Sequence, residues 1–247
     1  MRKRADLLLV ERGFFDSRAR AQSAIAAGLV TADGVAVAKA SAMLAEAADI
    51  VAEAPHPYVS RGGIKLAHAL DRFAIEVTGR IGLDVGASTG GFSDVLLQRG
   101  AKRVYAVDVG RGQLHASLKD DRRLVDLEST DARSLTSLLV PETPDLVVSD
   151  VSFISLTLVL APALALAGGT ADLVALIKPQ FEAGRDHIGK GGIVRDEAVH
   201  TLVCDRIAAH VEGLGWDVRA LVRSPIEGGD GNREFLLIGK RRAGHLA

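Results

Sequence analysis

The sequence predicts an α/β protein: a large domain built on a doubly wound, mostly parallel sheet, preceded by a small α+β domain. Three observations lead to this prediction. Beyond residue 60, short apolar runs alternate with segments of helix length, which is typical of parallel sheets. Before residue 54, two helix-like patterns precede short strand-like runs. The length of 247 residues, with 48% hydrophobic residues, suits one large and one small globular domain.

The small domain, predicted over residues 1–54, begins with two helices. Residues 5–12 are apolar on one side and are followed by a glycine, which predicts a short first helix. Ser17 can cap a second helix that runs through Ala27. Gly28 then suits the left-handed residue that ends such a helix.

Short strands and a linker are predicted to complete the small domain. Residues 30–37 place an Asp-Gly turn between two β-like runs, and residues 49–53 suit another strand. Two prolines within residues 55–59 favour an extended linker. The large domain is therefore predicted over residues 60–247.

The large domain alternates strands and helices in the manner of a Rossmann-like sheet. Five β-like runs are separated by helix-length segments: 81–85, 104–108, 124–127, 146–149 and 173–177. A helical segment over residues 197–214 precedes two final runs, 216–223 and 234–239. Only a turn-rich stretch separates these two runs, so the last strand is predicted to be antiparallel.

The charge balance and the cysteine content bear on the partners of the protein and on its cellular compartment. The chain carries 30 Lys and Arg against 31 Asp and Glu, which argues against a uniformly basic nucleic-acid coat. Residues 1–23 nevertheless hold six basic and three acidic side chains, so the N-terminus has a basic face. Cys204 is the only cysteine, and the first residues do not resemble a secretory leader. We therefore expect a cytoplasmic protein.

An uncharged stretch over residues 151–171 is long enough to span a membrane. It contains Pro162 and the pair Gly168-Gly169, and Asp172 follows it directly. These features favour a buried helix packed on the sheet, so no membrane association is expected.

A glycine-rich loop after the first strand of the large domain predicts a cofactor site. A dinucleotide-binding G-x-G-x-x-G motif needs a glycine where Ser88 stands, and Asp84 would repel phosphate. A carboxylate there suits a ligand with an ammonium and a sulfonium group, namely S-adenosylmethionine, although a turn without a ligand is the alternative. Asp108, at the end of the second strand, can accept hydrogen bonds from ribose hydroxyls. The candidate binding residues are Asp84, Gly86, Ser88, Thr89, Gly90, Gly91, Phe92 and Asp108.

A second glycine-rich segment, residues 184–191, matches a phosphate-binding G-x-x-x-x-G-K motif up to its last position. The Ser or Thr that would ligate magnesium is missing, and Gly191-Gly192 follow Lys190 in place of a helix. We interpret the segment as a flexible loop that can close over substrate.

The residue types in the sequence limit which kind of atom can accept the methyl group of S-adenosylmethionine. Methylation of a base carbon usually requires a cysteine nucleophile, but Cys204 lies within a predicted helix and suits a small core residue. Methylation of an exocyclic amine commonly uses an Asp/Asn-Pro-Pro-aromatic turn, whereas the turn at residues 150–153 lacks the prolines. A hydroxyl acceptor needs a group that removes or orients its proton and needs no metal. The seven histidines are dispersed and predict no metal site.

Four charged side chains are predicted to reach the carboxyl edge of the sheet. Asp150 ends the fourth strand and Lys178 ends the fifth. Glu234 opens the last strand, and Lys65 lies on the helix before the sheet. Lysine is scarce, with 8 residues against 22 arginines, and only lysine can plausibly lose its proton. The alternative for each residue is a solvated charge at a strand end.

Six segments together resemble a known family: 2–6 (RKRAD), 58–66 (YVSRGGIKL), 84–92 (DVGASTGGF), 150–156 (DVSFISL), 178–182 (KPQFE) and 231–235 (GNREF). They are similar to the TlyA family of bacterial ribosomal-RNA 2′-O-ribose methyltransferases, which carry an FtsJ-like catalytic domain and are sometimes labelled haemolysins. The resemblance implies a catalytic tetrad of Lys65, Asp150, Lys178 and Glu234, in which Lys178 activates the 2′-hydroxyl. It also implies methylation of cytidine in ribosomal RNA of the small subunit, the large subunit or both.

The resemblance further implies an N-terminal RNA-binding domain like that of ribosomal protein S-four. The candidate RNA-binding residues are Arg4, Arg18, Arg20, Gln22 and Arg61, of which Arg61 can instead pin the linker. One departure concerns the segment after the third strand, where the family commonly has Asn and this chain has Asp131. Asp131 can still accept a hydrogen bond from the adenine amine, so we expect the cofactor to bind.

Two readings from other functional classes remain open. A pore-forming cytolysin, as the haemolysin label suggests, would insert residues 151–171 into lipid. A non-catalytic ribosome-binding assembly factor would tolerate the loss of Lys178.

Overall fold

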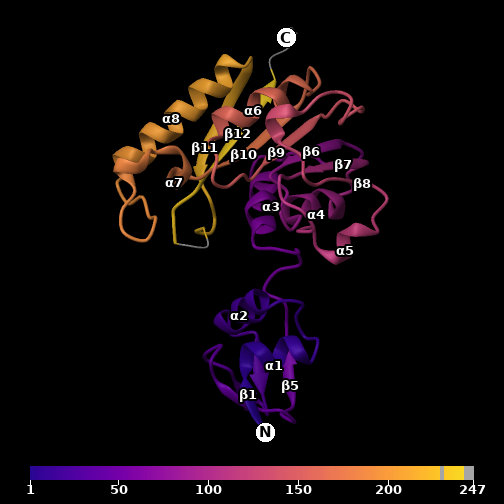
Figure 1. The fold of residues 1–247 in the computed structure, drawn as a ribbon, viewed down its shortest axis with the longest axis vertical. Coiled ribbons are helices and arrows are strands. Elements are labelled where there is room, and N and C mark those ends of the chain that lie inside the picture. Colours follow the sequence, from indigo (N-terminus) through magenta and orange to yellow (C-terminus); the bar gives the residue numbers. More distant parts are fainter. Residues whose placement is uncertain (229–230, 242–247) are drawn as a thin grey trace. The chain divides into compact units, whose positions relative to one another are not determined.

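The computed structural model describes residues 1–228 and 231–241, and the chain forms two compact units, Met1–Pro57 and Tyr58–Ala247 (Figure 1). Tyr58 and Val59 fall in the predicted linker but lie in the second unit. There the Val59 N–H donates a hydrogen bond to Asp94 Oδ2 at 2.8 Å.

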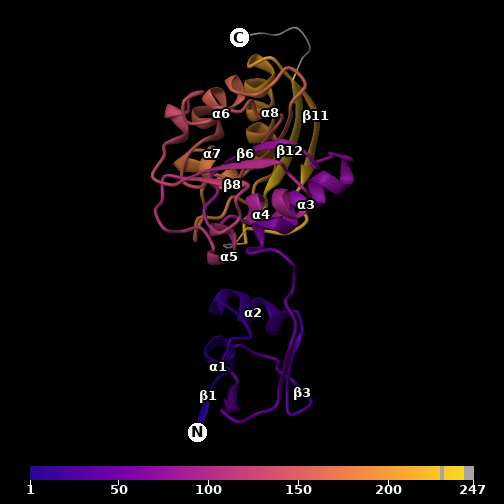
Figure 2. The same ribbon diagram turned by 90° about the vertical axis from the view of Figure 1, so that its right-hand side faces the viewer.

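The first unit combines two helices with two small antiparallel sheets (Figure 2). Its elements are β1 (Arg2–Arg4), α1 (Ala5–Glu11), α2 (Arg18–Ala26), β2 (Val30–Ala32), β3 (Val35–Ala36), β4 (Met43–Ala45) and β5 (Ile50–Ala52). The predicted cap of α2 is confirmed, because Ser17 Oγ accepts a hydrogen bond from the backbone N–H of Arg20. The hairpin is also confirmed: Asp33 and Gly34 have φ values of +51° and +76° between paired strands.

The β1–β4 pair was not predicted from the sequence. Both strands have three residues, and β1 consists of the basic residues Arg2, Lys3 and Arg4. The alternation of apolar and polar residues that identifies a strand is therefore absent from β1. The core of this unit lies between the helices and the sheets, where Leu8 and Leu9 are 2% and 0% exposed.

The second unit is built on a seven-stranded sheet in the order β11-β12-β10-β9-β6-β7-β8. The strands are β6 (Ile81–Val85), β7 (Arg103–Val107), β8 (Leu124–Leu127), β9 (Leu146–Ser149), β10 (Asp172–Ile177), β11 (Trp216–Arg223) and β12 (Phe235–Arg241). Neighbouring strands from β8 to β10 are parallel, while β12 is antiparallel to both β10 and β11. The predicted doubly wound sheet with an antiparallel last strand is confirmed.

Helices cover both faces of this sheet (Figures 1 and 2). One face packs against α3 (Gly62–Arg72), α4 (Gly91–Gln98) and α5 (Ala116–Lys119), and the other against α6 (Leu156–Ala165) and α8 (Glu197–Gly213). Alternate residues of β10 enter the two cores: Leu173 lies in one and Val174 in the other, both 0% exposed. The parallel strands are therefore apolar on both sides, which explains their continuous apolar runs in the sequence.

The predicted buried helix in the uncharged segment 151–171 is confirmed over residues 156–165, which form α6. Helix α6 contains Pro162 and buries Leu156, Val159 and Leu160 in the core. Within the described part of the chain, no helix has the length and apolar character needed to cross a membrane.

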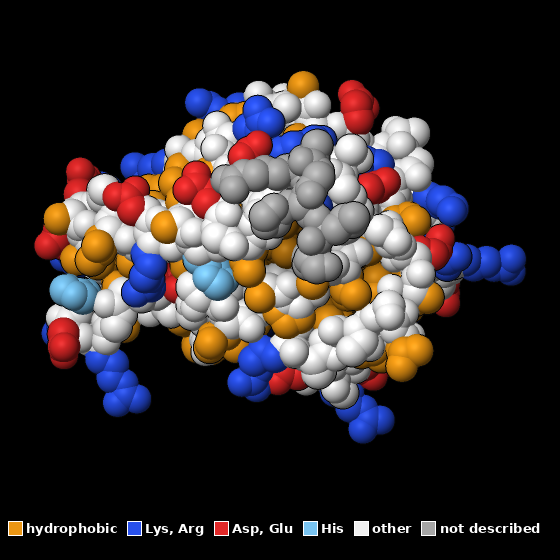
Figure 3. Space-filling model, turned by 90° about the horizontal axis from the view of Figure 1, so that it is seen from above, with side chains coloured by type: hydrophobic (Ala, Val, Ile, Leu, Met, Phe, Trp, Pro, Cys, Tyr) orange, Lys and Arg blue, Asp and Glu red, His pale blue; other side chains and the backbone are white. Residues whose placement is uncertain are grey.

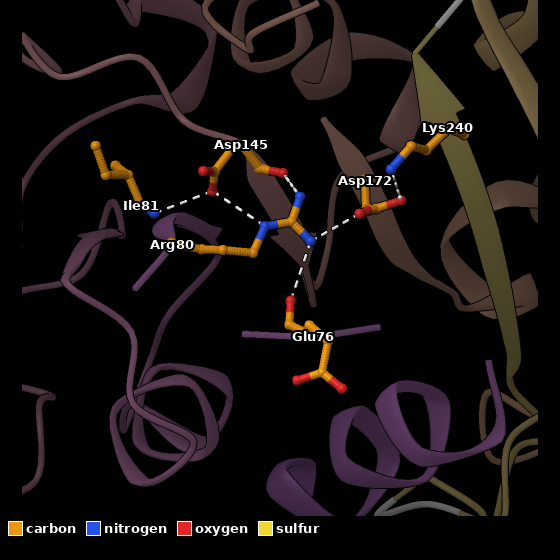
Figure 4. A network of polar contacts seen from close by, with 6 residues as sticks. All are labelled: Glu76, Arg80, Ile81, Asp145, Asp172 and Lys240. Atoms are coloured by element: carbon orange, nitrogen blue, oxygen red, sulfur yellow. Dashed lines mark hydrogen bonds and ion pairs between the residues drawn. The ribbon is translucent and has the colours of Figure 1, made fainter. Parts of the chain in front are cut away.

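Paired charges join the amino ends of three strands at the edge opposite the glycine-rich loop (Figure 4). Arg80 Nε contacts Asp145 Oδ1 at 3.2 Å, and Arg80 Nη1 contacts Asp172 Oδ2 at 2.7 Å. Lys240 of β12 contacts the other oxygen of Asp172 at 2.9 Å. Seen from the end where β12 finishes, basic and acidic side chains are interspersed around the rim (Figure 3). Complementary charges therefore hold this edge together.

Candidate active site

The four predicted catalytic residues form two ion pairs at the carboxyl edge of the sheet. Lys178 follows β10 and Asp150 follows β9, and Lys178 Nζ lies 2.6 Å from Asp150 Oδ1. Lys65 projects from α3, and its Nζ lies 2.5 Å from an oxygen of Glu234, which precedes β12. Lys65, Asp150 and Lys178 line one hollow of about 170 Å³. Residues from four separate parts of the chain therefore meet here.

The two ion pairs differ in their access to solvent. The side chains of Lys65 and Glu234 are 9% and 2% exposed, and those of Lys178 and Asp150 are 11% and 20% exposed. Lys178 Nζ also donates a hydrogen bond to the exposed Ser152 hydroxyl at 2.8 Å. Both lysines are therefore mostly buried and line the hollow, with Glu234 the most buried and Asp150 the most exposed of the four side chains.

The glycine-rich loop packs directly against the turn that carries Asp150. Gly86 has a φ of +86°, and a Cβ at this position would lie 2.9 Å from the carbonyl oxygen of Asp150. Only glycine fits this close approach without strain. Ser88 also has a positive φ, +49°, and its N–H donates to Asp108 Oδ2 at 2.8 Å. A non-glycine residue held in this conformation is frequent where a loop is shaped to receive a ligand.

Asp84 is a fully buried carboxyl group at the end of β6. Its Oδ2 accepts hydrogen bonds from the Ser93 N–H at 2.9 Å and the Ser93 hydroxyl at 2.7 Å. Its Oδ1 is buried and has no hydrogen-bond partner among the described residues. Burial raises the pKa of Asp84 to about 7, opposed by the Ser93 hydrogen bonds and reinforced by the nearby Asp150 and Asp108. This site favours a ligand that brings positive charge.

A larger cavity of about 490 Å³ adjoins the lysine hollow. The two share the walls Gly86, Ser88, Asp150 and Ser152. Of the predicted cofactor residues, Gly86, Ser88, Asp108 and Asp131 line the larger cavity, and Thr89, Gly91 and Phe92 line the smaller one. Asp84 and Gly90 are buried and line neither cavity. The arrangement offers a deep compartment beside a smaller one that holds the two lysines.

Asp108 and Asp131 have different surroundings in the larger cavity. Asp108 is half-buried, and its Oδ1 accepts a hydrogen bond from the Gly110 N–H at 2.7 Å. Asp131 is engaged by Arg133, whose Nη2 lies 2.5 Å from Asp131 Oδ2. This hydrogen-bonded ion pair lowers the pKa of Asp131 to about 2. Asp131 therefore stays ionised as an acceptor, but its two oxygens are shared with a neighbouring guanidinium.

Sequence reasoning missed an exposed aromatic residue beside the lysines. Phe153 is 91% exposed and has a φ of +65°. Its ring centroid lies 4.9 Å from that of Phe181, which follows Lys178 by three residues. The only signal in the sequence is that Phe153 takes the aromatic position of the turn beginning at Asp150. Ser152 was also missed, because a serine after a strand carries no distinctive pattern.

Glu182 joins the segment that follows β9 to the segment that follows β10, a few residues after Asp150 and Lys178. Glu182, at the end of α7 (Pro179–Glu182), is 6% exposed. It accepts hydrogen bonds from the Ser155 hydroxyl at 2.7 Å and from the Leu156 N–H at 2.8 Å. Glu182 thus fixes the start of α6 to α7, and with it the loop that carries Phe153.

The predicted RNA-binding residues have partners within their own units. In the first unit, Arg4, Arg18 and Gln22 all donate hydrogen bonds to Asp6. Arg20 lies 3.5 Å from Asp16. In the second unit, Arg61 Nη2 donates to the Glu227 carbonyl oxygen at 3.1 Å, so this residue connects α3 to the loop before β12. RNA binding by these five residues remains a prediction: Arg4, Arg18, Arg20, Gln22 and Arg61.

The described residues give little support to a cysteine nucleophile, a phosphate-binding loop or a metal site. Cys204 is buried on α8, and desolvation raises the pKa of its thiol to about 11, so the thiol stays protonated. No helix starts directly after Lys190, in agreement with the predicted loop. Over residues 1–228 and 231–241, no group of three or more acidic, histidine or cysteine side chains is arranged to hold a metal ion.

Comparison with known proteins identifies the family. Residues 58–241 match the FtsJ-like methyltransferases. The chain is 45% identical, over 96% of its length and 89% of the relative, to the 16S/23S rRNA (cytidine-2′-O)-methyltransferase TlyA of Mycobacterium tuberculosis. It is 39% identical to Hemolysin A of Brachyspira hyodysenteriae, over 94% of this chain and 98% of that protein.

A solved structure described as a hemolysin, from Streptococcus thermophilus, matches with a TM-score of 0.76 and 41% identity. The match covers 98% of this chain and 89% of that one, so both units have counterparts there. The chain therefore belongs to the TlyA family of FtsJ-like methyltransferases and is an S-adenosylmethionine-dependent enzyme.

Proposed function

We propose that this protein methylates the 2′-hydroxyl of a cytidine in ribosomal RNA, in the cytoplasm, on the small subunit, the large subunit or both. The observation that carries the proposal is the Lys178–Asp150 ion pair, which opens into a hollow adjoining the larger cavity. The TlyA relative of Mycobacterium tuberculosis, named for cytidine-2′-O methylation of 16S and 23S rRNA, supports this choice of substrate.

The residues of the larger cavity, together with the buried Asp84, fit S-adenosylmethionine. When bound, this cofactor supplies an electrophilic methyl group that needs no further activation by the protein. Asp84 acts through its buried charge and its unpartnered oxygen, which together favour the ammonium and sulfonium groups. Asp108 offers carboxylate oxygens to the ribose hydroxyls, and Asp131 offers an acceptor to the adenine amine. Gly86 gives the ligand access to the loop backbone.

Lys178 has the position of the group that handles the acceptor proton. Its nitrogen is held between Asp150 and Ser152, and in the neutral form it can take the proton of a 2′-hydroxyl group. Asp150 then stabilises the ammonium that forms. Lys65 presents a charged donor to the same hollow, and Glu234 fixes its direction from the sealed side. In this mechanism one lysine acts on the proton and the other orients the hydroxyl oxygen.

Phe153 suits the recognition of a nucleobase. Its ring is exposed at the mouth of the larger cavity and is supported on one side by Phe181. Aromatic side chains stack on unpaired bases in single-stranded or looped RNA, and each such contact contributes about 1–3 kcal/mol. We therefore assign Phe153 to holding the cytosine ring while its ribose enters the hollow.

The proposal is tested with the Lys178→Ala variant, in two measurements. Isothermal titration should show that the variant still binds S-adenosylmethionine, because Lys178 lies outside the larger cavity. Mapping of ribose methylation on unmodified ribosomal subunits should show a loss of at least about 100-fold, the scale of general-base catalysis. Lys102→Ala is a matched control, since Lys102 is exposed and precedes β7 at the amino edge of the sheet.

Each alternative function gives a different result in the same experiment. Normal methylation by the Lys178→Ala variant would refute the assigned base. Lysis of cells by the purified protein, without methylation, would favour the cytolysin. Ribosome binding without methylation by either protein would favour the assembly factor.

A further inference from the structure

A single buried carboxylate in the first unit gathers three of the predicted RNA-binding side chains. Asp6 lies on α1 and is 0% exposed. Its Oδ1 accepts a hydrogen bond from Arg4 Nε at 3.0 Å, and its Oδ2 accepts from Arg4 Nη2 at 3.0 Å. The same Oδ2 accepts from Arg18 Nη2 at 2.9 Å and from Gln22 Nε2 at 2.8 Å. Arg18 and Gln22 are one turn apart on α2, so the contacts join two helices and β1.

The acid is sealed while the arginines face solvent. The side chains of Arg4 and Arg18 are 42% and 54% exposed, although both touch the fully buried Asp6. A guanidinium carries five N–H donors. Arg4 directs two of its nitrogens toward Asp6 and Arg18 directs one, so donors on both groups remain for an external ligand. Hydrogen bonds from Arg4, Gln22 and Arg18 lower the pKa of Asp6, which keeps it ionised.

We propose that Asp6 is a positioning residue, which holds Arg4 and Arg18 side by side as a clamp for the phosphates of a folded RNA. The proposal rests on the proposed function, because it concerns how the first unit binds the RNA substrate. Long arginine side chains lose rotamer freedom when they bind a ligand, and prior fixation by Asp6 removes part of that cost. The planar guanidinium then meets phosphate oxygens with its remaining donors.

The direction in which one substitution changes the affinity for RNA separates this proposal from simple charge attraction. Asp6→Asn removes a negative charge, so long-range electrostatics alone predicts tighter binding to polyanionic RNA. If Asp6 acts by positioning the arginines, the same substitution weakens binding, because an amide cannot accept four hydrogen bonds from cationic and amide donors. We expect a loss of about 10-fold in affinity, equivalent to one charge-assisted contact.

The experiment measures binding of the full-length protein to unmodified small and large ribosomal subunits, each tested separately, over a range of salt concentrations. Asp6→Asn should weaken binding and reduce the slope of log K against log[salt], because fewer phosphates are neutralised. Glu53→Gln is the charge-matched control: Glu53 is an exposed acidic residue of the same unit and follows β5. This control should leave binding unchanged or slightly tighter. Affinity for S-adenosylmethionine should be the same in all three proteins.

A double-mutant cycle with Arg18→Lys distinguishes positioning from a general loss of structure. Arg18→Lys keeps the charge but loses the planar fork, so it should weaken binding by about 5-fold. If Asp6 acts through Arg18, the double variant should bind about as weakly as Asp6→Asn alone, not 50-fold weaker. Hydrogen exchange of the α1 amides should match the wild type.

The outcomes also separate the inference from the proposed function. If the wild-type protein binds neither the small nor the large subunit, the proposed function fails. If the wild type binds, and Asp6→Asn binds equally well or more tightly, the positioning role alone is overturned. Additive losses in the cycle, or unprotected α1 amides in Asp6→Asn, would equally overturn it.

Discussion

The buried Asp84 predicts that cofactor affinity depends on pH between pH 5 and 7. Its pKa of about 7 means that most molecules of the unliganded protein carry a neutral Asp84 below pH 7. A ligand with an ammonium and a sulfonium group favours the ionised form. Binding of S-adenosylmethionine below pH 7 should therefore release a proton from Asp84.

The size of the effect follows from the fraction of ionised Asp84. With a pKa of about 7, roughly 1% of the protein is ionised at pH 5 and roughly half at pH 7. If only the ionised form binds tightly, the apparent Kd at pH 5 should be about 50-fold higher than at pH 7. The donor amine stays protonated over this range, since α-amino groups titrate near pH 8.

The assay is isothermal titration of S-adenosylmethionine at pH 5, 6 and 7, each in two buffers with different ionisation enthalpies. The difference in heat between the buffers reports the number of protons released. The Asp84→Asn variant is the control, because an amide keeps an acceptor for Ser93 but cannot ionise. The variant should bind weakly at every pH and release no proton.

The same ionisation has a consequence for stability, with a defined sign. Asp84 has a higher pKa in the folded protein than its ordinary value of 3.8. Between pH 4 and 7 the folded state therefore holds a proton that the unfolded state has lost, so stability falls as pH rises through this window and is flat above it. The loss is on the order of 4 kcal/mol, from 1.36 kcal/mol for each unit of pKa.

Two results of the titration would refute the assignment of Asp84 to cofactor binding. One is a Kd for S-adenosylmethionine that changes by less than 3-fold between pH 5 and 7. The other is an Asp84→Asn variant whose Kd has the same pH profile as the wild type.

Two further substitutions probe opposite edges of the sheet. Phe153→Ala removes an exposed ring, so the free energy of unfolding should stay within about 0.5 kcal/mol of the wild type, while methylation should fall by about 10-fold or more because base stacking is lost. An unchanged kcat/KM on ribosomal subunits would contradict this role. Arg80→Met leaves Asp145 and Asp172 without their shared cation, so denaturant unfolding should show a loss of stability of about 1–3 kcal/mol. Affinity for S-adenosylmethionine should not change, and a lower affinity would show that the two edges of the sheet are coupled.

Most of the large domain could be predicted because its sheet is buried on both faces. The predicted runs 81–85 and 146–149 coincide with the buried strands β6 and β9, and the run 173–177 coincides with all but the first residue of β10. Buried parallel strands require uninterrupted apolar residues, so the signal is local and strong. The order of the strands in the sheet is a property of the whole chain, and the sequence analysis did not predict it.

The candidate site was predictable where residue type and strand position coincide. Lys178 and Asp150 follow adjacent parallel strands, and such positions share one edge of a sheet. The pairing of Lys65 with Glu234 joins residues 169 positions apart, which no local pattern encodes. The missing partner of Asp84 could not be foreseen either, because it depends on how closely the surrounding loop packs.

The small domain shows a different limit. Its helices and hairpin have caps and turn residues that act within a few positions, so they were predicted. Strand β1 is held by pairing with a segment some forty residues away, and its own composition favours solvent. The convergence of Arg4 and Arg18 on Asp6 likewise depends on the packing of α1 against α2.

The wall that the two hollows have in common bears on the design of inhibitors. Gly86 and Ser88 line both compartments, so a molecule that fills one lies against a wall of the other. A compound that tethers an adenosine group to a pyrimidine ribose by a short bridge would engage both compartments together. Its second half would bind at the high local concentration that a tether creates, which allows modest fragments to combine into a tight ligand.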